Sequence, residues 1–400
     1  MRVLVSVDAQ LWKTPDGKIW SKTMYDYSFW ERYLDVFEEI LIVSRIGYKE
    51  SDEVNGFLRC DGKHVEFFEL PMAIGAKSYI RNISVFLKSA TRAVKNIDCA
   101  IIRLPSVSGM FIEMAFKKTN KPYAVEVVVD PQNAYSDNCF YKYIFTWLLR
   151  KTVKNANGVS YVTRFDLQKK YPAYSLIHGN DEKHFSEYYS SIRLKKDYYY
   201  KVREFINIRK LRIIHVANNM NNYIKGHKTA LEVVQKLTID GIDCNITFIG
   251  DGKKRNEFED YACYLGIKEK VDFVGVISNP DLIRQKLIEA DLFLFPSSAE
   301  GLPRVLIEAM AVGLPCLASP INGIPELLPG KYLFYQDDIE GFVTTIKRLY
   351  YSTSELNKMS ADNFLKAQEY EDSILQGRRN AFFKKLRFLV ENENSEKSYL

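Results

Sequence analysis

The chain of 400 residues is 46% hydrophobic and 26% charged, so it can bury a full core and is longer than one domain usually runs. Its six cysteines are scattered without CxxC pairs, and none of its five histidines has a metal-ligand spacing with cysteine, which argues against structural zinc and predicts reduced thiols. No apolar segment approaches the roughly 20 residues that span a bilayer, and no secretory leader is expected. We expect two domains and a cytoplasmic location.

The net charge of +6 belongs to the first half of the chain. Residues 1–200 hold 29 Lys and Arg against 23 Asp and Glu, which leaves 27 against 27 for residues 201–400. This excess predicts an anionic partner for the first half, either a membrane surface or a diphosphate-bearing substrate, and chance surface charge is the alternative. Nucleic acid is not expected as a partner, because the sequence has no Arg/Gly-rich tract, RNP-like strand or zinc-finger spacing.

Short apolar runs rich in Val, Ile and Phe alternate with longer amphipathic segments from the start of the chain. In the first half, this pattern predicts strands over residues 1–7, 39–43, 65–70, 99–103, 123–129 and 158–162, and helices over 28–37, 79–94 and 141–154. Crossovers of this length connect parallel strands, so we expect a doubly wound α/β sheet.

Residues 178–210 lose this alternation and become polar and tyrosine-rich, which marks the region between two domains. The alternation then restarts, with strands expected over 211–216, 244–249, 271–274 and 291–295, and helices over 228–237, 254–265 and 281–289. The second half is therefore expected to be a second Rossmann-like lobe. Two such lobes are expected to face a cleft into which the carboxyl ends of their strands point, where such folds bind nucleotides.

The densest functional signal is the segment 291–328, DLFLFPSSAEGLPRVLIEAMAVGLPCLASPINGIPELL. A buried strand is expected first, then a loop that ends at Gly301, and then a helix that begins at Pro303. The backbone N–H groups of Arg304 and Val305 would then meet an anion, because the first N–H groups of a helix have no intrahelical partner and the helix dipole favours negative charge there.

Glu300 lies in the loop before this helix and Glu308 lies roughly a turn and a half inside it, so both can face one ligand. In a nucleotide-sugar site, Glu308 would accept hydrogen bonds from the two ribose hydroxyls, and Glu300 would lie against the transferred sugar. The alternative is an ordinary pair of acids near a helix start, where acids are common.

Read together with AEGLPRVLIEAMAVGLPCLAS and NGIPE, the segment from Glu300 to Glu308 resembles the E-x7-E signature of the family-four retaining glycosyltransferases of GT-B fold, the group that contains bacterial capsular and exopolysaccharide enzymes. The resemblance implies two Rossmann-like lobes around a central cleft. It divides the chain into an acceptor-binding lobe at 1–195, a donor lobe at 196–372, a closing helix at 373–390 that crosses back to the first lobe, and a polar, frayed tail at 391–400.

The same family pattern has a Gly-Arg pair and then a Lys-Gly that clasp the donor diphosphate. This chain reads HVANNMNNYIKGHK, so Lys225 and Gly226 match the second element, while Asn218 or Asn219 stands where the arginine would be. FIGDGK resembles the Gly-rich turn of the family at Gly250, and VDFVGVI resembles the segment whose Gly275 backbone borders the nucleobase. The resemblance thus implies a catalytic role for Glu300 and Lys225. For donor binding it implies Glu308, Gly301, Arg304, Val305, Asn219, Gly250 and Gly275.

The acceptor lobe offers Arg103, Glu126 and Asp130, which are expected at carboxyl ends of strands. Arg103 and Glu126 are acceptor-side candidates and Asp130 is a catalytic candidate, and for each of them a purely structural role is the alternative. Many members of the family place a histidine in this lobe against the donor sugar, and no histidine of this chain occupies a matching motif.

Two basic amphipathic stretches, residues 77–96 and 140–154, are expected either to rest on an anionic membrane or to pack their apolar faces on the sheet. The resemblance implies transfer of a sugar, with retention and without a metal or other cofactor, from a nucleoside diphosphate sugar of UDP or GDP type to a glycan acceptor. That acceptor would be linked to a lipid such as undecaprenyl diphosphate, in bacterial surface polysaccharide synthesis. A nucleotide-sugar 2-epimerase and a degenerate nucleotide-binding scaffold remain the alternatives.

Overall fold

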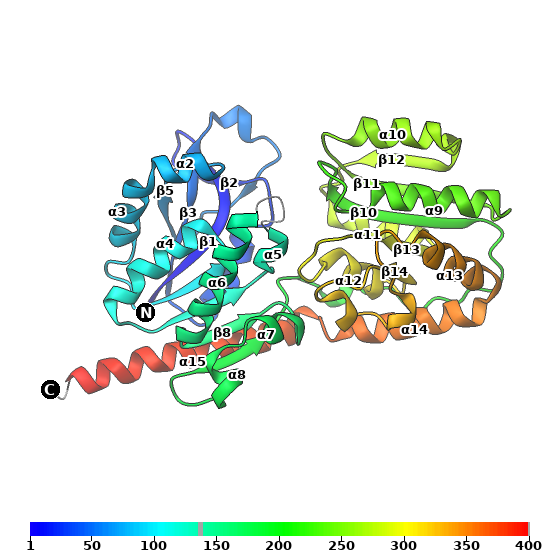
Figure 1. Cartoon of the computed structure of the whole chain (residues 1–400). Coiled ribbons are helices and arrows are strands. Elements are labelled where there is room, and N and C mark those ends of the chain that lie inside the picture. The colour runs from blue at the N-terminus through cyan, green and yellow to red at the C-terminus, as the bar shows by residue number, and fades with distance from the viewer. Residues whose placement is uncertain (135–138, 399–400) are drawn as a thin grey trace. The chain divides into compact units, whose positions relative to one another are not determined.

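The computed structural model describes residues 1–134 and 139–398, and it divides into two compact units (Figure 1). Residues Met1–Tyr189 and Gln376–Leu400 form the first unit, and Ser190–Leu375 form the second. The second unit begins at Ser190, six residues before the predicted start at 196. Arg203 anchors the first segment of this unit. The Arg203 guanidinium donates to the carbonyl oxygens of Val312, Ala290 and Leu287.

The first unit is built on a nine-stranded sheet with the order β4-β2-β1-β6-β7-β8-β9, and β3 pairs with β1 and β5. Its strands are β1 (Arg2–Lys13), β2 (Ile19–Ser21), β3 (Glu39–Tyr48), β4 (Leu58–Arg59), β5 (Val65–Leu70), β6 (Cys99–Leu104), β7 (Tyr123–Val127), β8 (Gly158–Tyr161) and β9 (Phe185–Tyr188). All pairings are parallel except those of β2 with β1 and β4. The predicted doubly wound sheet is therefore confirmed.

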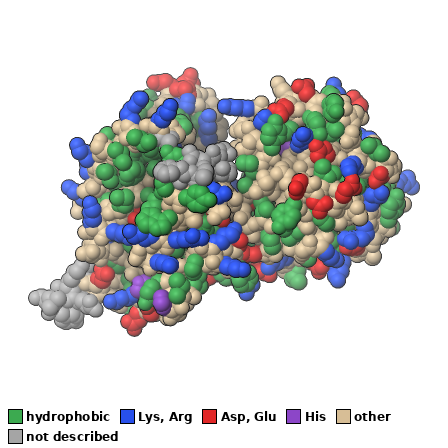
Figure 2. Space-filling view, in the orientation of Figure 1, with side chains coloured by type: hydrophobic (Ala, Val, Ile, Leu, Met, Phe, Trp, Pro, Cys, Tyr) green, Lys and Arg blue, Asp and Glu red, His purple; other side chains and the backbone are tan. Residues whose placement is uncertain are grey.

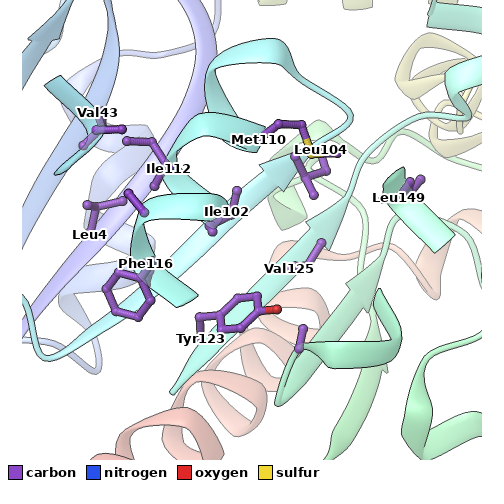
Figure 3. Close-up of a cluster of buried hydrophobic side chains, with 14 of the residues drawn as sticks. Leu4, Val43, Ile102, Leu104, Met110, Ile112, Phe116, Tyr123, Val125 and Leu149 are labelled. Carbon is purple, nitrogen blue, oxygen red and sulfur yellow. The ribbon is translucent and has the colours of Figure 1, made fainter. Parts of the chain in front are cut away.

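One face of this sheet is covered by helices that bury a continuous apolar core (Figure 3). The helices of the first unit are α1 (Tyr27–Leu34), α2 (Ala76–Arg81), α3 (Ile83–Ala93), α4 (Val107–Phe116), α5 (Pro131–Ala134), α6 (Cys139–Asn155), α7 (Asp166–Lys170) and α8 (Tyr174–His178). Leu4 and Ile102 from the strands meet Ile112 and Phe116 from α4, and all four side chains are fully buried. Closely packed side chains of this kind fix the sheet that carries the loops of the unit.

Aromatic side chains join the closing helix α15 (Asp372–Ser398) to the first unit. The Phe383 ring stacks on Tyr33 with centroids 5.0 Å apart, and Phe382 meets Phe185 at 5.1 Å. The predicted return of this helix to the first lobe is confirmed. The prediction of a frayed tail from residue 391 is wrong, because the helix continues to Ser398.

Two further predictions for the first unit differ from the structure. The helix expected over 79–94 is broken at Asn82, which ends α2 and begins α3 with φ −102 and ψ 11. The Asn82 side chain donates to the carbonyl oxygen of Ser78, the type of local bond by which asparagine competes with helix continuation. The stretch 178–210 was predicted to be irregular, yet it contains β9, which pairs with β8 at the sheet edge.

The second unit contains a five-stranded parallel sheet with the order β12-β11-β10-β13-β14. The strands are β10 (Leu211–Asn219), β11 (Cys244–Asp251), β12 (Val271–Gly275), β13 (Leu292–Phe295) and β14 (Cys316–Ala318). The helices are α9 (His227–Ile239), α10 (Arg255–Tyr264), α11 (Pro280–Glu289), α12 (Arg304–Ala311), α13 (Ile339–Tyr351) and α14 (Thr353–Gln368). From β10 the chain adds β11 and β12 on one side of the sheet, and then β13 and β14 on the other side. Between β10 and β13, at this switch point, the loops leave in opposite directions and open a crevice.

None of the helices in the described part of the chain combines the length and apolarity that crossing a membrane takes. Of the cysteines whose side chains are described, Cys60, Cys99, Cys244, Cys263 and Cys316 are free thiols, as predicted. The sixth, Cys139, lies outside the described side chains.

Candidate active site

A pocket of about 360 Å³ opens at the carboxyl ends of β10 and β13, at the switch point of the second sheet. We call it the donor pocket. Its walls come from the end of β10, the loop before α9, the N-terminal part of α11, the loop after β13 and the first two turns of α12. The lining residues are Tyr198, Val216, Ala217, Asn218, Asn219, Lys225, Pro280, Ile283, Phe295, Glu300, Pro303, Arg304, Val305 and Glu308.

Lys225 and Glu300 form an ion pair at one wall of the donor pocket, with Nζ 2.5 Å from Oε1. The Ser297 hydroxyl donates to the same carboxylate oxygen at 2.9 Å, which holds the Glu300 side chain in place. The two loops are also tied through their backbones, because the Ser298 N–H donates to the Ile224 carbonyl oxygen at 2.8 Å. The structure thus brings together two of the three side chains that were predicted to be catalytic, and the third, Asp130, lies in the first unit.

Gly226 makes the close approach of these loops possible. Its φ of +75 lies in the left-handed region, and a Cβ built there would sit 2.1 Å from the Pro296 carbonyl oxygen. Any other residue would push the Lys225 loop away from the loop that carries Glu300.

Glu308 lines the same pocket from the second turn of α12 and is half-buried there. Burial raises the pKa of its carboxyl above the usual value of 4.5, and the charge of Arg304 opposes that rise. The Tyr198 ring lies in the same wall, and its pKa is raised by burial and by the nearby Glu308 carboxylate. A carboxylate in such surroundings gains from hydroxyl donors, which a ligand can supply.

The start of α12 is positioned by the turn after β14. The Asn322 side chain donates to the Glu300 carbonyl oxygen, and the Gly323 N–H donates to the Gly301 carbonyl oxygen at 3.1 Å. Pro303 is the N-cap of the helix, so the helix begins at Arg304, one residue later than predicted. Arg304 and Val305 are its first two residues. Both line the donor pocket, and the contact of their N–H groups with an anion stays a prediction.

Gly250 shapes the pocket through the backbone, and neither Gly250 nor Gly275 is among the lining residues. A Cβ at Gly250 would lie 1.8 Å from the Ala217 carbonyl oxygen, so this glycine lets the turn after β11 pack against the end of β10. Ala217 and the two asparagines after it line the pocket. Gly275 ends β12 with a φ of +88.

The first-unit candidates are buried, and each is paired with neighbouring groups of the same unit. Arg103 and Glu126 form an ion pair with Nη1 2.5 Å from Oε2 and are 8% and 4% exposed, and the Tyr189 hydroxyl donates to the other carboxylate oxygen of Glu126 at 3.0 Å. Asp130 is 2% exposed and accepts from the Tyr171 hydroxyl at 2.6 Å and from the Gln132 N–H that begins α5. This geometry is that of residues that hold the fold together.

Sequence reasoning missed Tyr198, Pro280, Ile283 and the Arg304 side chain as pocket residues. Tyr198 belongs to the tyrosine-rich stretch 178–210, in which no spacing distinguishes one ring from the next. Only the backbone of Arg304 was expected at the site. The position of this arginine, two residues after Glu300-Gly301-Leu302, could have predicted a second cation there. Among the described residues, no three His, Cys, Asp or Glu side chains gather as a metal site.

The two Rossmann-like units have the GT-B fold, which solved structures such as that of Anabaena HepE share. Residues 201–364, which lie in the second unit, match the family model of the group 1 glycosyl transferases.

The chain is 28% identical to protein CapJ of Staphylococcus aureus over 362 residues, which cover 89% of this chain and 85% of CapJ. It is 35% identical over 158 residues to AmsK of Erwinia amylovora, an amylovoran biosynthesis glycosyltransferase, covering 37% of this chain and 38% of AmsK. The structure of Anabaena HepE in complex with UDP and glucose has a TM-score of 0.64 at 13% identity, with 100% of both chains covered, which shows a shared fold.

Proposed function

We propose that the donor pocket binds a nucleoside diphosphate sugar of UDP or GDP type. The observation that supports this most is the placement of two carboxylates and two cations around the start of α12 in one pocket of about 360 Å³. Glu308 accepts hydrogen bonds from the ribose hydroxyls, and Tyr198 with Ile283 borders the nucleoside. The diphosphate lies at the N-terminus of α12, where backbone N–H groups favour an anion.

Lys225 and Arg304 supply the positive charge that stabilises the departing diphosphate. In the transfer, the bond between the anomeric carbon and the diphosphate oxygen breaks, the acceptor hydroxyl oxygen bonds to that carbon, and the hydroxyl proton passes to the diphosphate. Negative charge develops on the leaving group, so preorganised donors there speed the reaction. An ammonium has three N–H donors, so Lys225 can serve Glu300 and a phosphate oxygen together. Arg304 takes the place of the arginine that Asn218 and Asn219 do not provide.

Transfer is metal-independent in this proposal, because the two cations and the helix N-terminus do the work of a divalent ion. Activity measured after exhaustive treatment with EDTA tests this directly. Unchanged turnover supports the proposal, and loss of turnover that Mg²⁺ or Mn²⁺ restores overturns it.

The proposed acceptor is a glycan hydroxyl, carried on a lipid diphosphate, and the configuration at the anomeric carbon is retained. The names of relatives support the setting, since one is protein CapJ and another is an amylovoran biosynthesis glycosyltransferase. Retention is measured by NMR of the product linkage, with an inverted anomer as the contrary result.

A lipid-linked acceptor places the first unit at a membrane, and the helices α2 and α3 fit that position. Ile80, Ile83 and Leu87 are 67%, 50% and 41% exposed, while Phe86 of the same helix is buried. Exposed Lys77, Arg81, Lys88 and Arg92 surround them. Figure 2 shows hydrophobic side chains on the surface of this unit among Lys and Arg side chains. Apolar insertion with flanking positive charge is how amphipathic helices bind anionic lipid.

Flotation with phosphatidylcholine vesicles, with and without phosphatidylglycerol, tests the membrane proposal. Binding should require the anionic lipid, weaken with salt, and be lost in an Ile80→Glu, Ile83→Glu variant. An Ile239→Glu variant is the control, because Ile239 is equally exposed but lies at the end of α9 in the second unit. Equal flotation of all variants contradicts the proposal.

The donor class is tested by the thermal midpoint of the protein in UDP, GDP and ADP and their sugar conjugates, because a ligand that binds only the folded state raises the midpoint. We expect one nucleotide to stabilise the protein selectively, and a Glu308→Ala variant to lose that response. Donor incubated without acceptor should remain unchanged, since conversion of the donor alone would show an epimerase. Tight nucleotide binding without turnover on any acceptor would show a scaffold.

A further inference from the structure

A second hollow, of about 620 Å³, lies against the same loops as the donor pocket and is lined by other residues. Ser297 and Ser298 line it, while Glu300 of the same segment lines the donor pocket. A neighbouring hollow of about 430 Å³ shares Tyr223 and Lys228 with it and extends along α9 and α10. We call the two together the tyrosine groove, after Tyr223, Tyr335, Tyr261 and Tyr264, which line it.

The tyrosine rings are unusually open for large aromatic side chains. Tyr223, Tyr335 and Tyr264 are 47%, 65% and 83% exposed. Tyr261 and Tyr264 lie with ring planes 16° apart and centroids 6.0 Å apart, so they present flat faces in similar orientation. Tyrosine combines an apolar ring face with a polar tip, which suits a ligand that has both C–H and O–H surfaces.

Polar groups of the groove are placed between these rings. The Ser319 hydroxyl is 1% exposed and has no hydrogen-bond partner among the described residues, and it lies in the wall of the larger hollow. Gln336 is held by a bond from its Nε2 to the Tyr223 carbonyl oxygen at 2.8 Å. A buried hydroxyl without a partner costs free energy, which a bound ligand with hydroxyl groups recovers.

The charges of the groove select against an anionic ligand. Lys228 is the cation that lines both hollows, and Glu232, Asp337, Glu257 and Asp260 are the acids around it. The Lys228 ammonium lies over the Tyr261 ring at 4.7 Å, and the Tyr261 hydroxyl donates to Glu232 at 2.6 Å. A nucleotide, a phosphate or an acidic peptide would meet net negative charge here.

We propose that the tyrosine groove binds a neutral glycan of several sugar residues, at a site separate from the donor pocket. The rings stack on the C–H faces of the sugars, and Ser319, Gln336 and Asp337 exchange hydrogen bonds with the sugar hydroxyls. The combined hollows have the size of ligand sites that hold more than one ring. The proposal does not depend on which nucleotide sugar is the donor.

A glycan in the groove contacts the outer side of the donor loops. Tyr223 precedes Lys225 by two residues, and Ser298 is joined to the Lys225 loop through Ile224. A glycan bound in the groove would therefore lie beside the loops that carry Lys225 and Glu300.

The experiment is saturation-transfer NMR on the full chain, with neutral oligosaccharides of glucose, galactose, mannose and N-acetylglucosamine as probes. We expect at least one probe to bind, and saturating UDP or GDP not to displace it. Tyr335→Ala and Tyr264→Ala should each weaken binding roughly five- to tenfold, the size of a lost aromatic contact. Tyr351→Ala is the control, because Tyr351 is 74% exposed at the end of α13 and does not line either hollow.

Three results overturn the proposal. They are no binding by any probe, full displacement by the nucleotide, and binding that Tyr335→Ala and Tyr264→Ala leave unchanged. Nucleotide binding by the same variants is measured in parallel, so loss of the groove is distinguished from failure of the donor pocket. All three tyrosines are exposed, and unchanged thermal midpoints show that the variants fold.

Discussion

The Glu308 carboxylate lies where burial makes its negative charge unfavourable in free energy unless a ligand binds to it. Burial raises its pKa, and the neighbouring Arg304 offsets only part of the cost. Groups of this kind are common at sites where binding or catalysis takes precedence over stability. The proposed ribose hydroxyls would restore the hydrogen bonds that the carboxylate lost on leaving water.

Glu308→Gln should therefore stabilise the protein while it weakens nucleotide binding. Because the Glu308 pKa is raised in the folded state, the protonated Glu308 carboxyl contributes to the free energy of unfolding below pH 4.5. This contribution is lost as the pH rises through the folded-state pKa. At pH 7 the variant should gain about 1 kcal/mol, or a few degrees in thermal midpoint. Its affinity for the nucleotide should fall roughly tenfold or more, because a hydrogen bond to a charged acceptor is lost. A destabilised variant with unchanged affinity contradicts both expectations.

Arg304→Ala should reduce turnover by about tenfold, because one of the two cations on the leaving group is removed. Arg209→Ala is the matched control, an exposed arginine of the same unit that does not line the donor pocket. The comparison is of kcat/KM for the donor at fixed acceptor. Equal kcat/KM values for the two variants would show that Lys225 and the N-terminus of α12 stabilise the leaving group without Arg304.

At the residue level, spacing in the sequence indicated which side chains lie together. Glu300 and Glu308 belong to one motif and Lys225 to another upstream, and the structure gathers all three in one pocket, while their roles there stay predictions. Arg103 and Glu126 were equally visible as polar residues on apolar strands, yet their side chains pair with each other. Strand position indicates which edge of a sheet a residue occupies, and it does not reveal whether a neighbour neutralises the side chain.

At the scale of elements, two buried histidines, His215 and His227, pack together at the start of α9. The Nδ1–H of His215 in β10 donates to the Leu294 carbonyl oxygen at 2.8 Å, and the His215 ring meets His227 at 4.6 Å. His227 stacks on Phe258 at 4.9 Å, and both of its ring nitrogens lack a partner among the described residues. Burial lowers the pKa of His215 to about 4 and that of His227 to about 2.

These shifts predict that the protein loses stability in mild acid. The unfolded chain binds protons at pH values below about 6.5 that the folded histidines do not, so each histidine contributes stability above 6.5 that is lost as the pH falls towards its folded pKa. Between pH 7.5 and pH 5 the loss should be roughly 2 kcal/mol for each. In urea unfolding at pH 7.5 and pH 5, the His227→Phe variant should show about half of this change in the free energy of unfolding. His178→Phe, at an exposed helix end, is the control and should leave it unchanged.

Most elements were predictable from the alternation of apolar and amphipathic segments, and β5 has its predicted bounds. The misses have local causes. β9 is short and only its first residue is buried, so it has no apolar run. The break at Asn82 depends on one side-chain bond that periodicity does not register. The end of α15 is polar throughout, and composition there does not distinguish a helix from a frayed tail.

At the scale of the whole molecule, the donor pocket belongs entirely to the second unit. Nucleotide binding should therefore protect backbone amides chiefly in that unit. In hydrogen exchange with saturating UDP or GDP, we expect the strongest protection in residues 216–226 and 300–308, which surround the pocket. Stronger protection within residues 1–189 would show that the nucleotide binds elsewhere.

The first unit is discontinuous along the chain, because its last helix follows the whole of the second unit. During synthesis, Tyr33, Phe37 and Phe185 must wait for Phe382 and Phe383, which are translated only after the whole of the second unit. The second unit is one uninterrupted stretch and has no such delay. The nascent first half therefore exposes these aromatic positions until α15 is made, and transiently exposed apolar surface of this kind is where a folding chain is prone to aggregate.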